Sequence, residues 1–485
     1  MTDILLIQPR EIDADQILNL PSLPLGLLSV STLLHRDYDI QIVDQRLPGN
    51  WQASILEALE AKPLVVGVTC LTGHQIHFAI EVSDFVRAHS DVPIVWGGLH
   101  FPVIIEQALA HPSVDGVVSG EGEQTFLEVV QALAAGRSPG GIPCYWSKED
   151  GAIVEPPSRP FLDFDSLPDL PYHLVDLKQY LRFRKDGASI VFESSRGCPN
   201  RCGFCACNFY SHRWRAMSAE RVVENILRFH REFGASMVVI VDDNFFVDKK
   251  RANAIFESLV KAGSPVTLDL QGVRVDSLER MTDEELTLMH RAGVVKINVG
   301  IESGSQRILE FIKKDITVER AIAQNHRLSK TETYVQYNFI TGFPTETEAE
   351  MKETIELALR LLKNNPKAML NYFCVFSPLP GTELYDFEKQ QGKQLPQSIE
   401  EWADYDRIYL NRRETGDIRK TNVPLNFVSL FVDRKIEYYS PSKLLHRLVS
   451  LYRPVARYRF ARQNFNFLVE KWFFDRLNRL SFGRM

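Results

Sequence analysis

The chain has 485 residues, which is too long for one ordinary hydrophobic core and predicts two or three domains. Hydrophobic residues make up 45% of it and charged residues 24%, the balance of a soluble globular protein. No apolar run reaches the roughly 18 residues of a membrane span, and the N-terminus lacks the pattern of a signal peptide. We therefore expect a cytoplasmic protein, in which clustered cysteines indicate metal binding or catalysis more often than disulfides.

Residues 1–140 alternate short apolar runs with helical patterns. Helix-like segments such as 24–36 and 73–89 separate five strand candidates, which are 3–9, 38–44, 64–70, 93–98 and 115–122. This alternation predicts an α/β fold with a doubly wound, Rossmann-like parallel sheet. Ligands of such sheets bind beyond the carboxyl ends of the strands.

A Pro-rich stretch, residues 141–187, cannot continue a helix and is interpreted as a linker. A second alternation fills residues 188–390, with strand candidates at 189–195, 236–243, 266–276, 294–303, 334–344 and 368–380. Six units are too few for an eight-stranded barrel and predict a partial (β/α)6 barrel. Residues 391–485 are expected to form a helical extension, which is basic and aromatic toward its end.

The first predicted barrel strand leads into a cysteine-rich stretch, ESSRGCPNRCGFCACNFY. Cys198, Cys202 and Cys205 have the spacing C-x3-C-x2-C. Zinc ribbons usually need two C-x2-C pairs to supply four tetrahedral ligands. Three thiolates instead suit a [4Fe–4S] cluster, whose fourth iron stays open to a cofactor or substrate. Cys207 and Cys374 are interpreted as packing thiols and left out of the site.

The cysteine spacing at this place in a six-unit barrel resembles the radical S-adenosylmethionine (SAM) superfamily. The resemblance implies that the open iron chelates SAM. It also implies that the ends of the next strands contact SAM, through Asp242, Asp243, Asn244, Arg274, Glu302, Ser303 and Gly342. Each of these motifs alone is also explained by turn chemistry. Four on successive strands are hard to ascribe to turns.

With the segment SPLPGTELYD, these motifs resemble cobalamin-domain radical SAM enzymes, the group of the anaerobic magnesium-protoporphyrin ester cyclase. That family carries D-x-H-x-x-G, S-x-L and G-G in its N-terminal domain. The matching cobalamin-binding positions here are Asp44, Gly49, Thr69, Leu71, Gly97 and Gly98.

This chain departs from the family pattern at Arg46, which replaces the histidine. A guanidinium has no lone pair for cobalt. The domain has therefore either lost the cofactor or binds cobalamin base-off, without a protein histidine ligand. We favour the second interpretation.

The resemblance implies that a reduced cluster cleaves SAM to a 5′-deoxyadenosyl radical, with electrons from an external donor such as flavodoxin or ferredoxin. Our first hypothesis is an anaerobic cobalamin-dependent C-methyltransferase that acts on an unactivated carbon of a small, apolar substrate. The second ends in ring closure, oxidation or rearrangement. The third is a non-catalytic SAM- or corrinoid-binding regulator, against which the intact cysteines argue. Methylthiotransferases share the spacing, but they hold a second cluster through three N-terminal cysteines, where this chain has only Cys70 and Cys144.

The net charge of −6 is unevenly distributed, because residues 441–485 carry ten Lys and Arg against two acidic residues. Nine aromatic residues accompany them: Tyr452, Tyr458, Phe460, Phe465, Phe467, Trp472, Phe473, Phe474 and Phe482. The simplest interpretation is a helical cap on the barrel. Leu and Phe at helical spacing favour an amphipathic surface over a base-stacking platform, so no nucleic acid is expected. The functional interpretation is peripheral contact with an anionic membrane, giving access to a lipid, isoprenoid or tetrapyrrole substrate.

Overall fold

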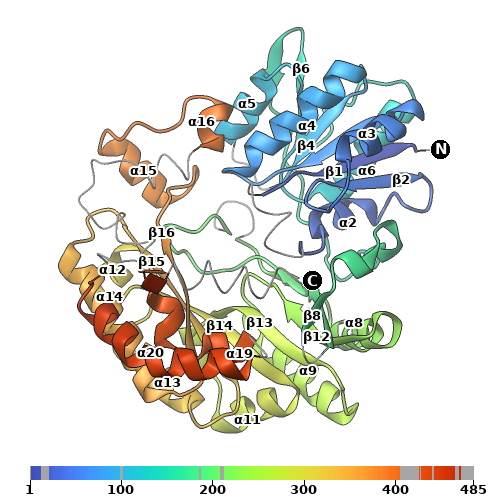
Figure 1. Cartoon of the computed structure of the whole chain (residues 1–485). Helices are drawn as coiled ribbons and strands as arrows, with labels where there is room; N and C mark the ends of the chain where they lie inside the picture. The colour runs from blue at the N-terminus through green and yellow to red at the C-terminus, as the bar shows by residue number, and fades with distance from the viewer. Residues whose placement is uncertain are drawn as a thin grey trace. The chain divides into compact units, whose positions relative to one another are not determined.

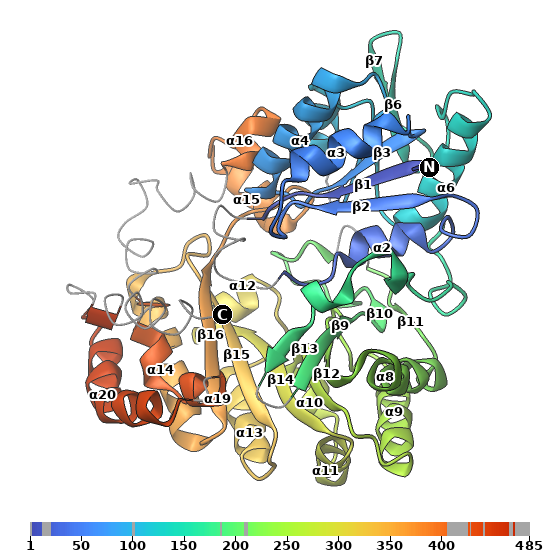
Figure 2. The ribbon, with the colours of Figure 1, turned by 45° about the vertical axis from the view of Figure 1, so that its right-hand side comes forward.

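The computed structural model describes residues 2–11, 21–98, 102–184, 187–207, 212–404, 425–426, 428–439, 442–464 and 469–470. The chain forms two compact units, residues 1–182 with 389–409 and residues 183–388 with 410–485 (Figures 1 and 2). Residues 389–404 belong to the first unit, where α16 (Ile399–Ala403) contacts α4 (Gln75–His89) and α5 (Pro102–Ala110). The predicted domain boundaries stay predictions.

The first unit contains a seven-stranded sheet in the order β2-β1-β3-β4-β5-β6-β7. Five strands are parallel: β1 (Ile4–Gln8), β2 (Ile40–Asp44), β3 (Val65–Thr69), β4 (Ile94–Gly97) and β5 (Gly116–Val118). The intervening helices include α2 (Leu25–Ser31), α3 (Trp51–Glu60), α4, α5 and α6 (Gly122–Ala134). The predicted doubly wound parallel sheet is confirmed.

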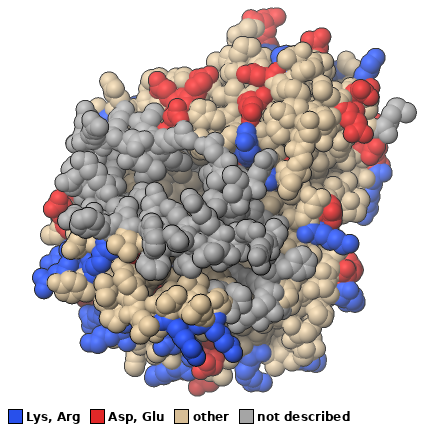
Figure 3. All heavy atoms as spheres, viewed as in Figure 1, with Lys and Arg blue, Asp and Glu red and all other residues tan. Residues whose placement is uncertain are grey.

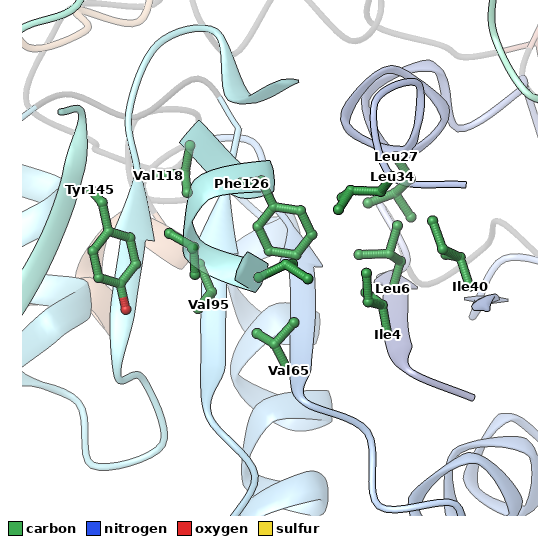
Figure 4. Close-up of a cluster of buried hydrophobic side chains, with 12 residues drawn as sticks. Ile4, Leu6, Leu27, Leu34, Ile40, Val65, Val95, Val118, Phe126 and Tyr145 are labelled. Atoms are coloured by element: carbon green, nitrogen blue, oxygen red, sulfur yellow. The ribbon is translucent and has the colours of Figure 1, made fainter. Parts of the chain in front are cut away.

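The core on one face of this sheet joins the strands to α2 and α6 (Figure 4). Leu6, Val65 and Phe126 are almost completely buried in it. Gly67 lies beneath them, and a Cβ there would stand 2.7 Å from Leu6 and 3.2 Å from Phe126. The glycine therefore lets α6 lie close to the sheet.

Part of the Pro-rich stretch extends this sheet. β6 (Tyr145–Glu149) pairs antiparallel with both β5 and β7 (Ala152–Val154). Asp150 and Gly151 join the hairpin with φ of 49° and 80°, the positive values that a type I′ turn requires. Asp-Gly is a strong hairpin signal, which the surrounding prolines obscured in the sequence.

The second unit contains a seven-stranded sheet in the order β16-β15-β14-β13-β12-β9-β8. Its parallel strands are β9 (Gly187–Phe192), β12 (Ala235–Ile240), β13 (Thr267–Arg274), β14 (Val294–Glu302), β15 (Tyr334–Thr341) and β16 (Ala368–Val375). Six parallel strands confirm the partial barrel. Because β16 and β8 (Arg182–Arg184) are the two edges, the sheet is open.

Helices follow the strands of this unit, as Figures 1 and 2 show. They include α8 (Ala219–Phe233), α9 (Lys249–Lys261), α10 (Val275–Glu279), α11 (Asp283–Arg291), α12 (Gln306–Phe311), α13 (Val318–Leu328), α14 (Glu348–Asn364) and α15 (Glu383–Gln390). The first of them shows how local sequence sets these elements. Ser218 caps α8 by accepting a hydrogen bond from the Arg221 amide, and Gly234 ends it in the left-handed conformation.

The C-terminal part of the chain covers the edge strand β16. The Asn426 side chain bonds both the N–H and the C=O of Phe373, at 2.7 and 3.0 Å. The Asp433 carboxylate accepts the Leu370 N–H at 2.6 Å. Such pairing removes unsatisfied backbone groups from the sheet edge.

Two helices complete the described C-terminal residues, α19 (Lys435–Tyr439) and α20 (Lys443–Ala461). Phe460 of α20 is fully buried and packs on Phe373, with ring centroids 5.8 Å apart. This contact is of the kind expected from a cap on the barrel. The predicted aromatic positions 465, 467, 472–474 and 482 lie outside the described residues. Within the described part of the chain, no helix combines the length and apolar character of a membrane span.

Candidate active site

The three spaced cysteines lie on the loop that follows β9. Cys202 is buried, and Cys198 and Cys205 are half-buried. Gly203 anchors the loop, since its N–H donates to the Ile312 carbonyl at 2.9 Å and its carbonyl accepts the Leu384 N–H at 3.0 Å. The loop is thus held from two later parts of the same unit.

Asp242, at the end of β12, fixes the start of this loop. Its carboxylate accepts the Ser194 N–H at 2.7 Å and the hydroxyls of Ser194 and Ser195, each at 2.6 Å. Burial raises the pKa of Asp242, although these donors oppose the shift. Arg251 completes the arrangement by donating to the Ser194 carbonyl at 2.9 Å. Asp242 was predicted to contact SAM, and the structure shows both of its oxygens occupied by protein donors.

The next two residues lie at the cysteines themselves. Asp243 is exposed, and it accepts the Gly197 N–H at 2.8 Å and the Cys207 thiol at 3.2 Å. The Asn244 Nδ2 lies 3.6 Å from the Cys198 sulfur. The Asn244 Oδ1 is buried and has no hydrogen-bond partner among the described residues. Each oxygen of Asp243 also has a protein donor, but Asp243 is exposed where Asp242 is buried, so Asp243 and Asn244 can still meet a bound cofactor.

Nitrogen donors point at two of the three sulfur atoms. Asn200 Nδ2 is 3.3 Å from Cys198 Sγ, and Arg274 Nη1 is 3.3 Å from Cys202 Sγ. Within the described residues, no three His, Cys, Asp or Glu side chains converge on a single metal ion. A four-iron cluster binds each thiolate at a different iron, so its ligands need no common centre. The donor set therefore fits such a cluster.

The thiols differ in acidity. Burial raises the pKa of Cys202, and the charges of Lys314 and Arg274 oppose this shift. A hydrogen bond with Cys207 lowers the pKa of Cys205 to about 7, and the same bond raises the pKa of Cys207. Cys374 is exposed, not packed in the interior as expected.

The remaining predicted SAM contacts lie at the ends of β13, β14 and β15, with two different environments. Glu302 is buried with φ of 75°, and its carboxylate accepts the Lys314 Nζ at 2.6 Å. Ser303 is buried against α14, where its hydroxyl lies 3.3 Å from Thr354 Oγ1. Gly342 donates its N–H to Glu346. The structure joins Glu302 to Arg274 through Lys314, whereas Ser303 contributes to helix packing.

Two charged residues at this site escaped the sequence analysis, Lys314 and Arg251. Lys314 lies in the charged run after α12, and Arg251 lies on the amphipathic helix α9. Both patterns are typical of solvent-exposed side chains, yet the structure buries both residues. Local patterns carry no signal for either contact, because Arg251 lies 57 residues from Ser194 and Lys314 lies 12 residues from Glu302, beyond one helical turn.

In the first unit, the predicted cobalamin-binding residues lie at the carboxyl ends of β2, β3 and β4. Gly98 has φ of 129°, and a Cβ there would stand 2.0 Å from the Cys70 carbonyl oxygen. Among the described residues, a Cβ at Gly97 or Gly49 would meet no atom within 4 Å. Leu71 is 50% exposed, and Thr69 is half-buried. The edge thus offers open space beside glycine backbone, which fits close approach of a large planar ligand.

Arg46, in the place of the family's histidine, is buried and fully engaged. Its Nε and Nη2 bond the two oxygens of Asp44 at 3.0 and 2.8 Å. Nη1 bonds Glu11 at 2.8 Å, and Nη2 also bonds the Ser22 carbonyl at 2.9 Å. Tyr180, which the sequence analysis missed, donates to Asp44 at 2.9 Å. Arg46 and Asp44 therefore form a structural ion pair that presents no metal ligand.

Comparison with protein families identifies two domains. Residues 192–358 match the radical SAM superfamily, and residues 19–130 match the B12 binding domain. An uncharacterized methyltransferase of Pyrococcus horikoshii is 29% identical over 444 residues, 90% of this chain and 94% of the relative. A cytidylyl-2-hydroxyethylphosphonate methyltransferase of Streptomyces wedmorensis is 26% identical over 74% of this chain and 77% of its own. An anaerobic magnesium-protoporphyrin IX monomethyl ester cyclase of Rubrivivax gelatinosus is 26% identical over 68% of this chain and 60% of its own.

Solved structures share the fold. The radical SAM methyltransferase TsrM of Kitasatospora setae, with cobalamin and a [4Fe–4S] cluster bound, has a TM-score of 0.68 at 17% identity. The alignment covers 96% of this chain and 99% of TsrM. The cobalamin-dependent radical enzyme OxsB, with aqua-cobalamin and SAM bound, has a TM-score of 0.71 at 18% identity. This alignment covers 99% of this chain and 81% of OxsB. The cofactors expected from the sequence are those of the two matched domain families.

Proposed function

This chain is a radical SAM enzyme related to cobalamin-dependent methyltransferases, and we propose that it transfers a methyl group to an unactivated carbon of a small molecule. The observation that carries the proposal is the cysteine loop after β9, with nitrogen donors at its sulfur atoms, in a chain that also has a B12 binding domain. In such enzymes, SAM, the cluster and cobalamin supply the radical and the methyl group.

The side chains at the cysteine loop have separate roles. Cys198, Cys202 and Cys205 would hold the cluster, and Asp242 keeps the start of the loop in place. Asp243 and the unpartnered Asn244 oxygen are the acceptors available for the SAM amine. Phe204, on the same loop, packs on Phe343 with ring centroids 5.7 Å apart. These rings add an apolar surface to the loop that carries the thiols.

In the first unit, the open strand edge at Gly49, Leu71 and Gly97 would receive cobalamin. Arg46 cannot serve as an axial ligand, because its guanidinium is always protonated and is bonded to Asp44 and Glu11. We therefore propose that cobalamin binds without a protein ligand to cobalt.

A specific observation favours a second candidate, radical ring closure. Three relatives are named as anaerobic magnesium-protoporphyrin IX monomethyl ester cyclases, and their alignments cover 54–70% of their own lengths. Two relatives with longer alignments are named as methyltransferases. We therefore place methyl transfer first.

Anaerobic reconstitution with iron, sulfide and methylcobalamin tests the proposal. The loaded chain is incubated with SAM that carries a deuterated methyl group, a low-potential reductant and extracts of small molecules, including apolar ones. We expect a deuterated product by mass spectrometry, absent with Cys202→Ala. Formation of 5′-deoxyadenosine without any deuterated product would instead support ring closure, oxidation or rearrangement.

We also propose that α20 contacts an anionic membrane. Five apolar side chains recur every three or four residues on its exposed face: Leu444, Leu448, Leu451, Val455 and Tyr458, which are 48–78% exposed. The helix contains no Asp or Glu, and Lys443 and Arg447 flank the stripe. Figure 3 shows Lys and Arg side chains over the region of α19 and α20. Two such helices from separate copies would repel each other, whereas anionic lipid would attract both.

Vesicle co-sedimentation tests this contact. Binding to phosphatidylglycerol vesicles should exceed binding to phosphatidylcholine, weaken at high salt, and fall at least tenfold in Leu451→Glu. The matched control is Ile153→Glu, which adds the same charge at a 40% exposed position on β7. Equal binding by Leu451→Glu and the control would leave packing as the role of α20. Dimerisation that Leu451→Glu abolishes would assign the stripe to a second copy.

A further inference from the structure

Two buried cations lie beside the cysteine loop. The Arg274 side chain is 7% exposed, and its Nη1 lies 3.3 Å from the Cys202 sulfur. Lys314 is also 7% exposed, and its Nζ lies 6.0 Å from the centre of the Phe204 ring on the same loop. Charges that are buried rather than solvated interact strongly with their surroundings, because little water screens them.

The structure holds Arg274 in one orientation. Nε donates to Asp276 at 2.8 Å, and Nη2 donates to the Lys314 carbonyl at 2.8 Å. With both of these groups engaged, the planar guanidinium directs Nη1 to the sulfur. The contact with Cys202 therefore follows from a rigid arrangement.

Lys314 is held just as firmly. Its N–H donates to the Leu309 carbonyl at 3.0 Å, and its Nζ donates to Glu302 at 2.6 Å. Gly300 makes room for this ion pair, because a Cβ there would stand 2.4 Å from the Glu302 carboxylate. Both cations are paired with a carboxylate, Lys314 with Glu302 and Arg274 with Asp276, and Arg274 also bonds a cysteine sulfur directly.

We propose that Arg274 is a positioning residue that raises the reduction potential of a cluster bound through Cys202. This inference rests on the proposed cluster. One-electron reduction makes the cluster and its thiolates more negative by one charge, so a nearby buried cation stabilises the reduced form. A hydrogen bond to a ligand sulfur acts in the same direction. Arg274 would thereby help an external one-electron donor to reduce the cluster, a role distinct from the predicted contact with SAM.

The test is a redox titration of the reconstituted full chain, without SAM, followed by the electron paramagnetic resonance signal of the reduced cluster. Arg274→Gln keeps a donor but removes the charge. We expect its ratio of reduced to oxidised cluster to fall about tenfold at a fixed potential, a shift of about 59 mV for one electron. Arg274→Lys should stay closer to the wild type, because it keeps the charge.

A second variant should shift the reduction potential in the opposite direction. Asp276→Asn removes the carboxylate that partly neutralises Arg274, so the potential should rise. Arg320→Gln is the matched control, since Arg320 pairs with Glu279 at an exposed site and should leave the potential unchanged. Iron and sulfide are measured in every variant. If Arg274→Gln holds no cluster, the reduction potential of Asp276→Asn tests the inference instead.

A wild-type potential in loaded Arg274→Gln would overturn the inference, as would an unchanged or lower potential in Asp276→Asn. Neither result would contradict the proposal of methyl transfer, because methyl transfer is measured on the wild-type enzyme. A wild-type chain that never binds a cluster would instead overturn the proposed function itself.

Discussion

Arg46 in the first unit and Arg274 in the second begin from the same local arrangement. Each is buried, and each directs Nε to the Oδ1 of an Asp two residues away, at 3.0 Å for Asp44 and 2.8 Å for Asp276. They differ at the terminal nitrogens. Those of Arg46 bond Asp44, Glu11 and a carbonyl, whereas those of Arg274 bond the Cys202 sulfur and a carbonyl.

This difference distinguishes a structural arginine from one that acts on a cofactor ligand. Arg46 is neutralised by two carboxylates, so its charge stabilises the unit itself. Arg274 has one carboxylate partner and a sulfur that a cluster would use. Local sequence cannot separate the two cases, because both read as an Arg and an Asp at a strand end.

The largest expected effect comes from removing the cysteine ligands, because Arg274 then has no cluster to act on. The reconstituted wild type should contain about four iron and four sulfide per chain. Cys198→Ala, Cys202→Ala and Cys205→Ala should each lose the cluster and form no 5′-deoxyadenosine. Cys207→Ala is the control and should keep its cluster. Wild-type 5′-deoxyadenosine formation in any of the first three would contradict the ligand assignment.

Arg46→Met tests whether Arg46 is structural. Removing one partner of a buried ion pair should destabilise the first unit by about 3–5 kcal/mol, measured by urea unfolding. The cobalt absorption spectrum of bound cobalamin should stay base-off, because no bond to cobalt is lost. Arg87→Gln, at the exposed pair with Asp115, should cost below about 1 kcal/mol. Spectroscopic evidence for a histidine ligand on cobalt would refute this account.

Glu346 sharpens the comparison as a half-buried carboxyl group whose cationic neighbour, Arg307, is already paired with Glu350. Burial raises its pKa to about 7, although the amides of Gly342 and Phe343 donate to it. The folded state therefore holds a proton that the unfolded state releases near its ordinary pKa of 4.5. Stability should fall by about 2 kcal/mol as the pH rises from about 4.5 to 7.

Glu346→Gln should flatten this part of the stability profile, measured by urea unfolding at a series of pH values. Glu348→Gln is a nearby control on the exposed start of α14. A wild-type slope in Glu346→Gln would assign the pH dependence to other groups.

The smallest effect on stability is expected at Gly97. A Cβ there meets no atom of the described part of the chain within 4 Å, so Gly97→Ala should change the free energy of unfolding by less than about 1 kcal/mol. If the corrin approaches this backbone, its affinity should still fall about tenfold, measured by equilibrium dialysis. Gly98→Ala is the contrast, because its Cβ would clash with the Cys70 carbonyl and destabilise the unit. Unchanged affinity in Gly97→Ala would place cobalamin elsewhere.

Much of the architecture could be predicted from the sequence. The five and six strand–helix alternations appear as two parallel sheets, because buried parallel strands need continuous apolar runs and helical crossovers. The β6–β7 hairpin was missed, since its Asp-Gly turn lies between proline-rich segments.

Some features of the candidate site could likewise be predicted from the sequence, and others could not. The spacing of Cys198, Cys202 and Cys205 and the arginine at position 46 are properties of the sequence by itself, and they determined the class of cofactor chemistry and the lack of an axial histidine. Only the tertiary structure decided that Asp242 bonds Ser194 and that Arg274 reaches Cys202, which is 72 residues away along the chain. Periodicity and turn chemistry report on near neighbours. The partner of a buried charge is set by the packing of distant strands.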